Sequence, residues 1–539
     1  MPYSFLTVFL FSLLNIISGC DQTSKAPIEY IFTSDDTECL LSNNNTQDLK
    51  ATINVEGMRH VVLSKDTTFG SQFKYRHTIY EICNEFDLKG QIVKIPDDCI
   101  LFFNGGILYD GTVIGHNTCI RADKKKIFNT DLYIQGVWNV DIAYPEWYGA
   151  RGDGKTDDRI PIQNTIDAFP YTLLSPKTYL INSVNNKDEK YGLVLTRGKK
   201  LAGTRIQCTT FAEDLDNITI KVNEKLDIVS VVRMTSLCEL DHIGIIGNRV
   251  NANSSCVSSE QASRMILNNV SVAKSNVGFD MKSYLTKYES CYASYCQIGF
   301  SLNGTGVKNT TNVLEACQAI DCKQYGYYFN MITYSTLISC AADGCGTSDL
   351  SSLGYAYYLD RCDCMSFVSC GCEQSLKPLF CQQSKNIAFT NCNYLVDKHH
   401  LTLPKDYKLN DIINIRHSEH IKIEDCIVNY SLVKKNIEPD ARLIHLYGSA
   451  TDKVVLTYVP DVEDAVRREN IGASGFIDVS KNLRYLYSEN YPDKGNSRER
   501  PRFKNGSLMK GFQFFDTSLG KPIWWDGVNW VDAVGNRVK

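Results

Sequence analysis

The sequence has no excess of charge of either sign. It contains 61 acidic and 57 basic residues, which give a formal net charge of −4. Nucleic-acid binding needs a concentrated basic face, so we expect no nucleic-acid partner. Hydrophobic residues make up 43% of the chain and charged residues 22%, a balance that excludes intrinsic disorder, a collagen and a multi-span membrane protein.

Motifs for common cofactors are also missing. The cysteine intervals do not follow the spacing of zinc ligands, and no glycine-rich phosphate loop is present. His242 and the pair His399-His400 have no obvious partners, so surface or core positions are expected for them. Tyrosine, in contrast, is abundant at 30 residues, and this side chain suits half-buried β surface and flat ligand platforms.

The N-terminus resembles an export signal. An apolar run ends in Ile17-Ser18-Gly19-Cys20, which resembles the lipobox of bacterial lipoproteins, where the cysteine is lipidated and becomes the mature N-terminus. No Lys or Arg precedes the run, and an uncleaved single anchor is the alternative. Both interpretations place the remaining chain outside the cytoplasmic membrane. The lipobox predicts a cell-envelope lipoprotein that contacts the membrane only through Cys20.

Residues 262–395 contain a loose internal repeat. Five segments align on a cysteine, at intervals of 22 to 30 residues. These cysteines are Cys291, Cys317, Cys340, Cys370 and Cys392. Repeats of this length indicate a solenoid. The short apolar strands, broken by Gly, Asn, Ser and Asp and without a helical apolar period, predict a β-solenoid.

The chain has 21 cysteines, one of them Cys20. In an exported chain the first expectation is a disulfide framework. Parallel coils stack about 4.8 Å apart, so a repeated residue forms a ladder, and a small, soft side chain suits a buried ladder. Distance alone allows disulfides between coils, but the spacing favours reduced, packed cysteines. Because Tyr288 and Cys291 belong to apolar columns of different parity, we expect a bend between them.

Residues 145–168, YPEWYGARGDGKTDDRIPIQNTID, carry the most specific motif. They closely resemble the opening motif of the pectate-lyase superfamily, in the branch that is named after rhamnogalacturonase and epimerase-like pectate lyases and also includes phage tailspikes. The matching residues are Trp147, Gly149, Gly152, Asp153, Gly154, Thr156, Asp157, Asp158, Ile162, Gln163 and Ile166. The resemblance, which the repeats extend to about residue 430, implies a right-handed parallel β-helix.

This motif has a structural interpretation. Gly152 and Gly154 permit a tight turn, and Asp157 or Asp158 can cap the helix that follows. An apolar side of that helix would cover the open end of the first coil, which is otherwise an exposed sheet edge. The residues expected on that side are Ile160, Ile162 and Ile166. We therefore expect no catalytic role for the aspartates of the motif.

The expected fold class is all-β: a right-handed parallel β-helix, or β-solenoid, with a short N-terminal capping helix and a small C-terminal β-hairpin cap. The regions are a signal peptide at 1–19, an N-terminal β-rich segment or early coils at 20–140, the β-helix at 141–485, and a linker with an aromatic cap at 486–539. Asp526-Gly527 between aromatic strands predicts the hairpin. Three tryptophans there either pack or stack on sugars: Trp524, Trp525 and Trp530.

Two carboxylates share one column of the repeat. Asp343 and Glu373 each lie three residues after a ladder cysteine, so their backbones should be about 4.8 Å apart on adjacent coils. Repulsion should raise one pKa, and a metal, a shared proton or a substrate would compensate. Burial would be costly, so we place the acids on the outer face, beside the insertion 346–353. Ordinary turn residues are the alternative, since Asp343 precedes Gly344.

Three functions fit these residues. The first is a polysaccharide lyase acting on a uronic-acid glycan, in which Asp343 and Glu373 hold Ca²⁺ and other side chains handle protons. The residues that we expect on the same face are Lys323, Arg361 and Tyr355 for proton transfer, and Tyr325 and Tyr357 for substrate binding. The second is a glycoside hydrolase that uses the two acids directly. The third is a non-catalytic, tailspike-like glycan-binding protein.

The family resemblance leaves some points open. The Gly-His-Gly and Arg-Ile-Lys signatures of the polygalacturonase branch are absent, and no lyase signature marks the site. Apart from a possible Ca²⁺ ion, no cofactor is expected. The oligomeric state is either monomer or trimer, since related tailspikes are trimers and many β-helix lyases are monomers.

Overall fold

The computed structural model describes residues 57–204, 219–304, 309–346, 354–398, 409–424, 426–429, 494–500 and 513–538, together with strands between 437 and 487. Residues 59–539 form one unit and residues 1–58 another. The predicted lipobox with Cys20, the insertion residues 347–353 and His399-His400 lie outside the described residues. Within the described residues, no helix has the length and apolar character that crossing a membrane requires.

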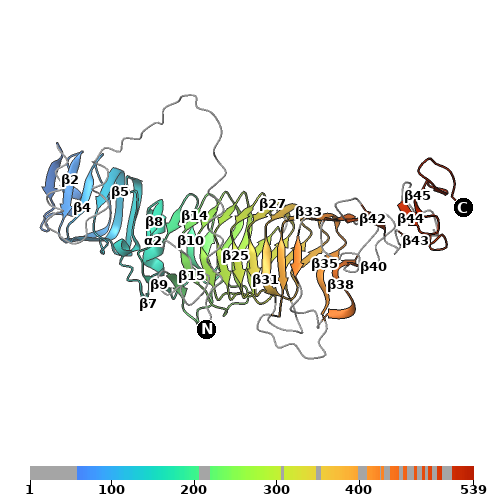
Figure 1. The fold of residues 1–539 in the computed structure, drawn as a ribbon. Coiled ribbons are helices and arrows are strands. Elements are labelled where there is room, and N and C mark those ends of the chain that lie inside the picture. Colours follow the sequence, from blue (N-terminus) through green and yellow to red (C-terminus); the bar gives the residue numbers. More distant parts are fainter. Residues whose placement is uncertain are drawn as a thin grey trace, which may run out of the picture. The chain divides into compact units, whose positions relative to one another are not determined.

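The chain winds into a right-handed parallel β-helix, which confirms the predicted fold (Figure 1). Each full coil adds one strand to each of three faces, and neighbouring strands on a face pair in parallel. Faces 1 and 2 belong to a 25-stranded sheet that bends between them, and face 3 is an 11-stranded sheet.

Face 1 consists of β10 (Tyr191–Leu195), β13 (Ser230–Met234), β16 (Ser255–Ser263), β19 (Val277–Tyr284), β22 (Ile298–Asn303), β26 (Tyr325–Asn330), β29 (Tyr355–Asp360), β32 (Leu379–Gln382), β35 (Leu409–Arg416), β38 (Ile437–Tyr447) and β40 (Val466–Glu469). Face 2 consists of β8 (Tyr171–Leu173), β11 (Lys200–Ala202), β14 (Glu239–Asp241), β17 (Ile266–Asn268), β20 (Lys287–Glu289), β24 (Val313–Glu315), β27 (Ile332–Ile338), β30 (Asp363–Val368), β33 (Lys385–Thr390), β36 (Glu419–Glu424), β39 (Lys453–Thr457) and β41 (Phe476–Val479). Face 3 consists of β7 (Asp153–Asp157), β9 (Thr178–Ile181), β12 (Thr219–Val222), β15 (Gly244–Ile246), β18 (Ser271–Ala273), β21 (Tyr292–Ser294), β25 (Gln318–Ile320), β28 (Ala341–Asp343), β31 (Gly371–Ser375), β34 (Asn393–Val396) and β37 (Ile427–Asn429). The register shifts within four of these pairs: β16 with β19, β31 with β34, β35 with β38, and β7 with β9.

A single left-handed residue makes the bend between face 2 and face 3. It precedes each ladder cysteine, and its φ is +49° at Ser290, +51° at Ala316 and +52° at Ser339. None of these is glycine, so each costs on the order of 1–2 kcal/mol, which the stacking of the coils must offset. The predicted bend between Tyr288 and Cys291 is confirmed, and it turns both side chains into the core.

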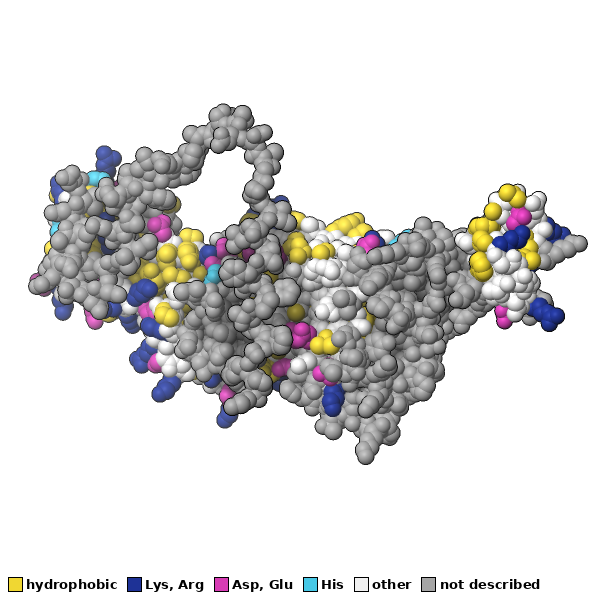
Figure 2. Space-filling model, viewed as in Figure 1, with side chains coloured by type: hydrophobic (Ala, Val, Ile, Leu, Met, Phe, Trp, Pro, Cys, Tyr) yellow, Lys and Arg dark blue, Asp and Glu magenta, His cyan; other side chains and the backbone are white. Residues whose placement is uncertain are grey.

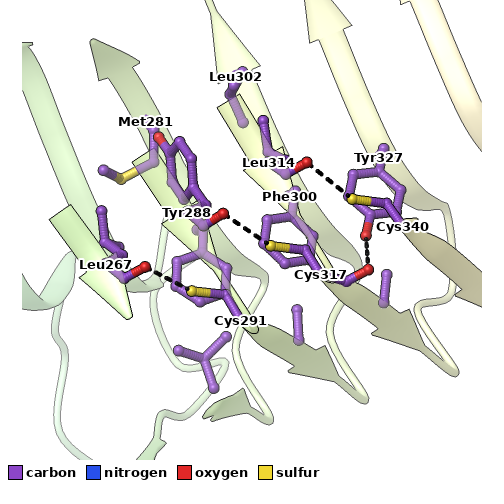
Figure 3. Packing of buried hydrophobic residues seen from close by; sticks show 14 of the residues in the cluster. Leu267, Met281, Tyr288, Cys291, Phe300, Leu302, Leu314, Cys317, Tyr327 and Cys340 are labelled. Carbon is purple, nitrogen blue, oxygen red and sulfur yellow. Dashed lines mark hydrogen bonds between the residues drawn. The ribbon is translucent and has the colours of Figure 1, made fainter. Parts of the chain in front are cut away.

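The cysteines form a buried ladder of thiols (Figure 3). Each thiol donates a weak hydrogen bond to a carbonyl of the preceding coil: Cys291 to Leu267 at 3.4 Å, Cys317 to Tyr288 at 3.6 Å and Cys340 to Leu314 at 3.4 Å. All cysteines of the described part of the chain are free. The structure therefore has packed, reduced cysteines where a disulfide framework was the alternative.

The Asp-rich motif organises the start of the β-helix around α2 (Arg159–Ala168). Asp158 accepts the backbone N–H groups of Arg151 and Gly152, at 2.7 and 3.0 Å. Asp157 accepts the N–H of Arg159 at 3.2 Å. The N-cap residue is Asp158, whose side chain makes no capping hydrogen bond to the helix, so the predicted side-chain cap was wrong because this carboxylate binds the preceding turn. Ile162 and Ile166 are buried in the main core, as predicted. The prediction for Ile160 was wrong, because this side chain is 44% exposed.

The strands before this motif also pair in parallel. They are β1 (Arg59–Val62), β2 (Thr78–Ile82), β3 (Glu85–Lys94), β4 (Ile100–Phe103), β5 (Ile107–Arg121) and β6 (Leu132–Trp138). Their side chains form a hydrophobic core of their own, to which Trp147 and Phe169 also belong. Hairpins pair their strands in antiparallel fashion, so the parallel pairing here is that expected of early coils.

The end of the chain contains a small separate sheet. Its strands are β43 (Lys494–Gly495), β44 (Gln513–Asp516), β45 (Lys521–Trp525) and β46 (Trp530–Val531). The predicted hairpin joins β45 and β46 in antiparallel pairing, and Asp526 closes its turn by accepting the N–H of Val528 at 2.7 Å. Trp530 is buried beside Phe514, so it packs within this sheet and is not exposed for sugar stacking.

Candidate functional site

Asp343 and Glu373 lie opposite each other on adjacent coils. Their strands β28 and β31 pair with Ala341 opposite Gly371, which brings the two acids into the same position two residues later. The backbone N–H of Glu373 donates to Oδ1 of Asp343 at 2.9 Å, and the N–H of Gly344 donates to the Glu373 carbonyl at 2.8 Å. The predicted adjacency is therefore confirmed.

Neither acid points into the core. Glu373 is exposed and Asp343 is half-buried. The Nε2 group of Gln318, on the preceding coil, donates to Oδ2 of Asp343 at 2.6 Å. Burial raises the pKa of Asp343, the carboxylate of Asp321 raises it further, and the hydrogen bonds from Gln318 and Glu373 oppose both effects. The site thus joins a carboxyl that holds its proton more strongly than usual to an exposed carboxylate.

Three other predicted residues share the corner between face 3 and face 1. Lys323 is exposed and lies between β25 and β26. Tyr325 and Tyr355 begin β26 and β29 and lie opposite each other, both half-buried. Asp343 ends β28 on the other side of the same corner. The structure therefore brings a cation and two phenols to the corner that the acids border; we call it the Asp343/Glu373 corner.

Arg361 does not belong to this corner. It follows the last residue of β29, six residues after Tyr355, which is about 20 Å along an extended strand. Its guanidinium pairs with Oδ2 of Asp360 at 3.1 Å and donates to Oδ1 of Asn330 at 2.9 Å. The expectation that Arg361 lines the same site as the acids was wrong, because it lies at the opposite edge of face 1.

Tyr357 lies inside the solenoid. It is 1% exposed, and its hydroxyl donates to the carbonyls of Cys340 and Gly371 at 2.9 and 2.6 Å. Its ring stacks on Tyr327 at 5.1 Å, and Tyr327 stacks on Phe300 at 4.8 Å. The predicted substrate-binding role was wrong, because the side chain fills the core and no ligand on the surface can reach it.

Sequence reasoning missed a column of aromatic rings on the outside of face 1. Tyr328, Tyr358 and Phe380 occupy one position on β26, β29 and β32, with ring centroids 5.3 and 4.9 Å apart. Tyr325 lies 4.9 Å from Tyr358, and Tyr355 lies 4.9 Å from Phe380. We call these five residues the aromatic strip. The signal was present in the repeated segments YGYYFN and YAYYLD.

A second pair of acids, Glu260 and Asp280, lies on face 1. Burial raises the pKa of Asp280, and the Glu260 carboxylate adds to that effect. However, Lys282 pairs with Glu260 at 3.2 Å, and Arg233 approaches it at 3.8 Å. Both bases thus contact Glu260, and we interpret this group as a surface ion-pair network.

His242 has a partner that the sequence did not reveal. Its Nδ1 lies 2.5 Å from Oδ1 of Asp241, whose other oxygen pairs with Lys200 at 3.0 Å. The group lies at the end of β14 on face 2. His242 is therefore hydrogen-bonded to Asp241 and partly exposed, on another face than the aromatic strip.

The carboxylate oxygens of Asp343 and Glu373 are poorly suited to bind calcium. Ca²⁺ takes six to eight oxygen ligands, whereas both oxygens of Asp343 already accept N–H donors, which would face a cation with their positive ends. Among the residues that the structure describes, no group of three or more His, Cys, Asp or Glu side chains is arranged to hold a metal ion.

Charges of both signs are interspersed on the visible face of the molecule, within the part that the structure describes (Figure 2). This distribution agrees with the near-zero net charge.

The sequence matches no protein-family profile and no curated protein, whereas solved structures share its fold. A tailspike of an Acinetobacter phage matches with a TM-score of 0.50 and 14% identity, over 74% of this chain and 77% of the tailspike. The A-module of an Azotobacter vinelandii mannuronan C-5 epimerase matches with a TM-score of 0.38 and 14% identity, over 63% and 100%. A glycan biofilm modifying enzyme of Pantoea stewartii matches with a TM-score of 0.33 and 12% identity, over 65% and 43%. These are right-handed parallel β-helix proteins, and the likeness is one of fold.

Proposed function

We propose that the protein is an exported polysaccharide-degrading enzyme whose catalytic centre is the Asp343/Glu373 corner. The observation that carries this proposal is the direct link between the two acids, in which the N–H of Glu373 holds the Asp343 carboxyl on the neighbouring coil. Most glycoside hydrolases use two carboxyl groups that flank the glycosidic bond. The lipobox-like N-terminus supports an enzyme that meets its polymer outside the cell.

Hydrolysis is the reaction that this geometry supports best. In the proposed reaction, Asp343 gives its proton to the glycosidic oxygen as the bond to the anomeric carbon breaks. Glu373 either attacks that carbon or removes a proton from the attacking water. The raised pKa of Asp343 suits the acid, and the exposed Glu373 suits the base or nucleophile. Proton transfer of this kind typically contributes a factor of about 10² to 10⁴.

Elimination from a uronic-acid glycan is the second candidate, and Lys323 favours it. This cation lies at the same corner and would neutralise a uronate carboxylate, while Tyr355 or Lys323 would remove the acidified proton. Arg361 is separated from the corner, so it cannot assist elimination there, and this makes elimination less favoured than hydrolysis. Burial raises the pKa of Tyr325, which makes that phenol a poorer base.

One assay distinguishes the candidates. Purified protein is incubated with a panel of uronic-acid and neutral polysaccharides, and reducing ends and ultraviolet absorbance are followed together. New reducing ends without absorbance mean hydrolysis, whereas absorbance of an unsaturated uronate means elimination. If neither signal appears with any polymer, the proposal is overturned and the non-catalytic, tailspike-like function remains.

The location and assembly are proposals of the same kind. We propose lipidation at Cys20 in the bacterial cell envelope, and Cys20→Ala should abolish incorporation of a labelled fatty acid during growth. Retained labelling would contradict the lipobox. The tailspike-like fold makes a trimer the alternative to a monomer, and light scattering during size-exclusion chromatography would separate the two.

A further inference from the structure

We infer that the aromatic strip is a binding track for an anionic polysaccharide that lies along the axis of the solenoid. The inference deepens the proposed function, on which it rests for the identity of the ligand as a glycan. It adds the class of polymer and the residues that hold it, which are different from the acids at the corner.

The strip is continuous and lies on an outward-facing column. The register places Ser301, Tyr328, Tyr358 and Phe380 in one line across four successive coils. Tyr328 and Tyr358 are half-buried, so part of each ring meets the surroundings, whereas Phe380 at the end of the line is only 6% exposed. The Tyr358 hydroxyl accepts Nε2 of Gln382 at 3.1 Å. Large apolar groups gathered on the outside of a soluble protein mark an interaction site. Edges that carry hydroxyl groups suit a partner that is itself amphipathic, as a sugar ring is.

Cations border the strip on both sides. At one edge, Nζ of Lys377 lies 5.4 Å from the centre of the Tyr355 ring. At the other, the Arg416 guanidinium lies 5.2 Å from the centre of the Phe380 ring. Lys323 and Arg361 lie at the same two edges. This charge favours a polymer with carboxylate or sulfate groups over a neutral one.

Asp360, an acid at the same edge of the strip as Arg361, is partly neutralised and incompletely hydrogen-bonded. Asp360 is 9% exposed, and Arg361 pairs with its Oδ2. Its Oδ1 is buried and has no hydrogen-bond partner within the described part of the chain. An unpaired buried acceptor costs about 1–3 kcal/mol.

The experiment measures binding without cleavage. The double variant Asp343→Asn/Glu373→Gln is run in affinity electrophoresis through gels containing polygalacturonate, alginate or hyaluronan, with dextran as the neutral polymer. Into this background are introduced Tyr358→Ala, the pair Lys377→Gln/Arg416→Gln, and the control Tyr334→Ala. Tyr334 is a matched control because it is 68% exposed and lies on face 2.

We expect at least one anionic polymer to retard the background protein, and added salt to weaken the effect. Tyr358→Ala and the charge pair should each raise the dissociation constant at least tenfold, while Tyr334→Ala changes it less than twofold. The charge pair tests the inference even if Tyr358→Ala fails to fold, because both bases are outside the core. Equal binding by all variants, equal retardation by dextran, or a change of oligomeric state in place of weaker binding would overturn the track.

The outcomes also separate this inference from the proposed catalysis. If the wild type binds an anionic polymer through the strip but cleaves none, the track stands and the catalytic proposal fails. If the wild type cleaves a polymer and the strip variants bind and cleave it as well as the wild type does, the track alone fails.

Discussion

The N–H of Glu373 donates to Oδ1 of Asp343 over 2.9 Å, which joins the two acids of neighbouring coils. Their separation is thus fixed by the solenoid itself, because both side chains start from paired β backbone. If these acids carry the reaction, Asp343→Asn and Glu373→Gln should each lower kcat at least 100-fold, in line with the loss of an acid or base. The melting temperature should stay near the wild-type value. A matched control is Glu315→Gln, an exposed acid on face 2, which should retain full activity; wild-type turnover in both site variants would clear the acids of a catalytic role.

The pH profile should report the proton on Asp343. A general acid works only while protonated, so activity should be present at low pH and fall as the pH rises through the pKa of Asp343, which burial raises. Asp321→Asn removes a charge that raises this pKa, so it should move the alkaline limb of kcat/KM to lower pH. Gln318→Met removes a hydrogen bond that lowers the pKa, so it should move the limb to higher pH. If the alkaline limb of kcat/KM moves in the same direction in both variants, or does not move, the pKa of another group determines that limb.

Removal of the Tyr357 hydroxyl should affect stability and leave binding unchanged. Tyr357→Phe removes the hydroxyl that donates to the Cys340 and Gly371 carbonyls. The Cys340 carbonyl still accepts the Gly371 N–H at 2.9 Å, and we expect a loss of about 1–2 kcal/mol in the free energy of unfolding. KM should not change, because the ring does not reach the surface. A higher KM at unchanged stability, measured by substrate titration and urea denaturation, would restore the predicted substrate-binding role.

Replacement of a ladder cysteine should also act on folding. Cys317→Ser places a hydroxyl in an apolar column between Cys291 and Cys340, which should cost about 1–3 kcal/mol. The exposed Cys83 is the control, and Cys83→Ser should change stability by less than about 0.5 kcal/mol. Thermal unfolding under reducing conditions measures both. An unchanged melting temperature for Cys317→Ser would argue against a tightly packed ladder.

Chelation should leave the activity intact. Because both oxygens of Asp343 already accept N–H donors, the proposed reaction uses no metal at this corner. Dialysis against EDTA should therefore change kcat less than twofold. Activity that is lost on dialysis and restored by Ca²⁺, but not by Mg²⁺, would revive the predicted calcium site.

The coil period could be predicted from the sequence because one cysteine recurs at each bend. Parallel coils stack without offset, so residues at equal distances from Cys340 and Cys370 must be neighbours. The adjacency of Asp343 and Glu373 follows from that rule alone. The right-handed course came from the resemblance of the Asp-rich motif, since spacing does not determine handedness.

The side chains around the acids were harder to place. Simple alternation puts Tyr355 and Tyr357 on one face, but Ala356 and Tyr357 are both buried, so the alternation shifts at that point and turns Tyr357 inward. Tyr358 then points outward and belongs to the aromatic strip. Arg361 was misplaced for a different reason: closeness in sequence means little in a strand, where each residue adds about 3.3 Å.

The stacking of whole turns has a consequence for how such a protein can change. A polymer lying along the axis meets a new set of side chains about every 4.8 Å, so the spacing between successive contact positions is constant. Duplication or deletion of one complete turn between β22 and β26 would shift all later coils along the axis by one coil spacing. The contacts within each turn would stay nearly the same. The length of oligomer that such a surface accommodates can therefore evolve in discrete increments.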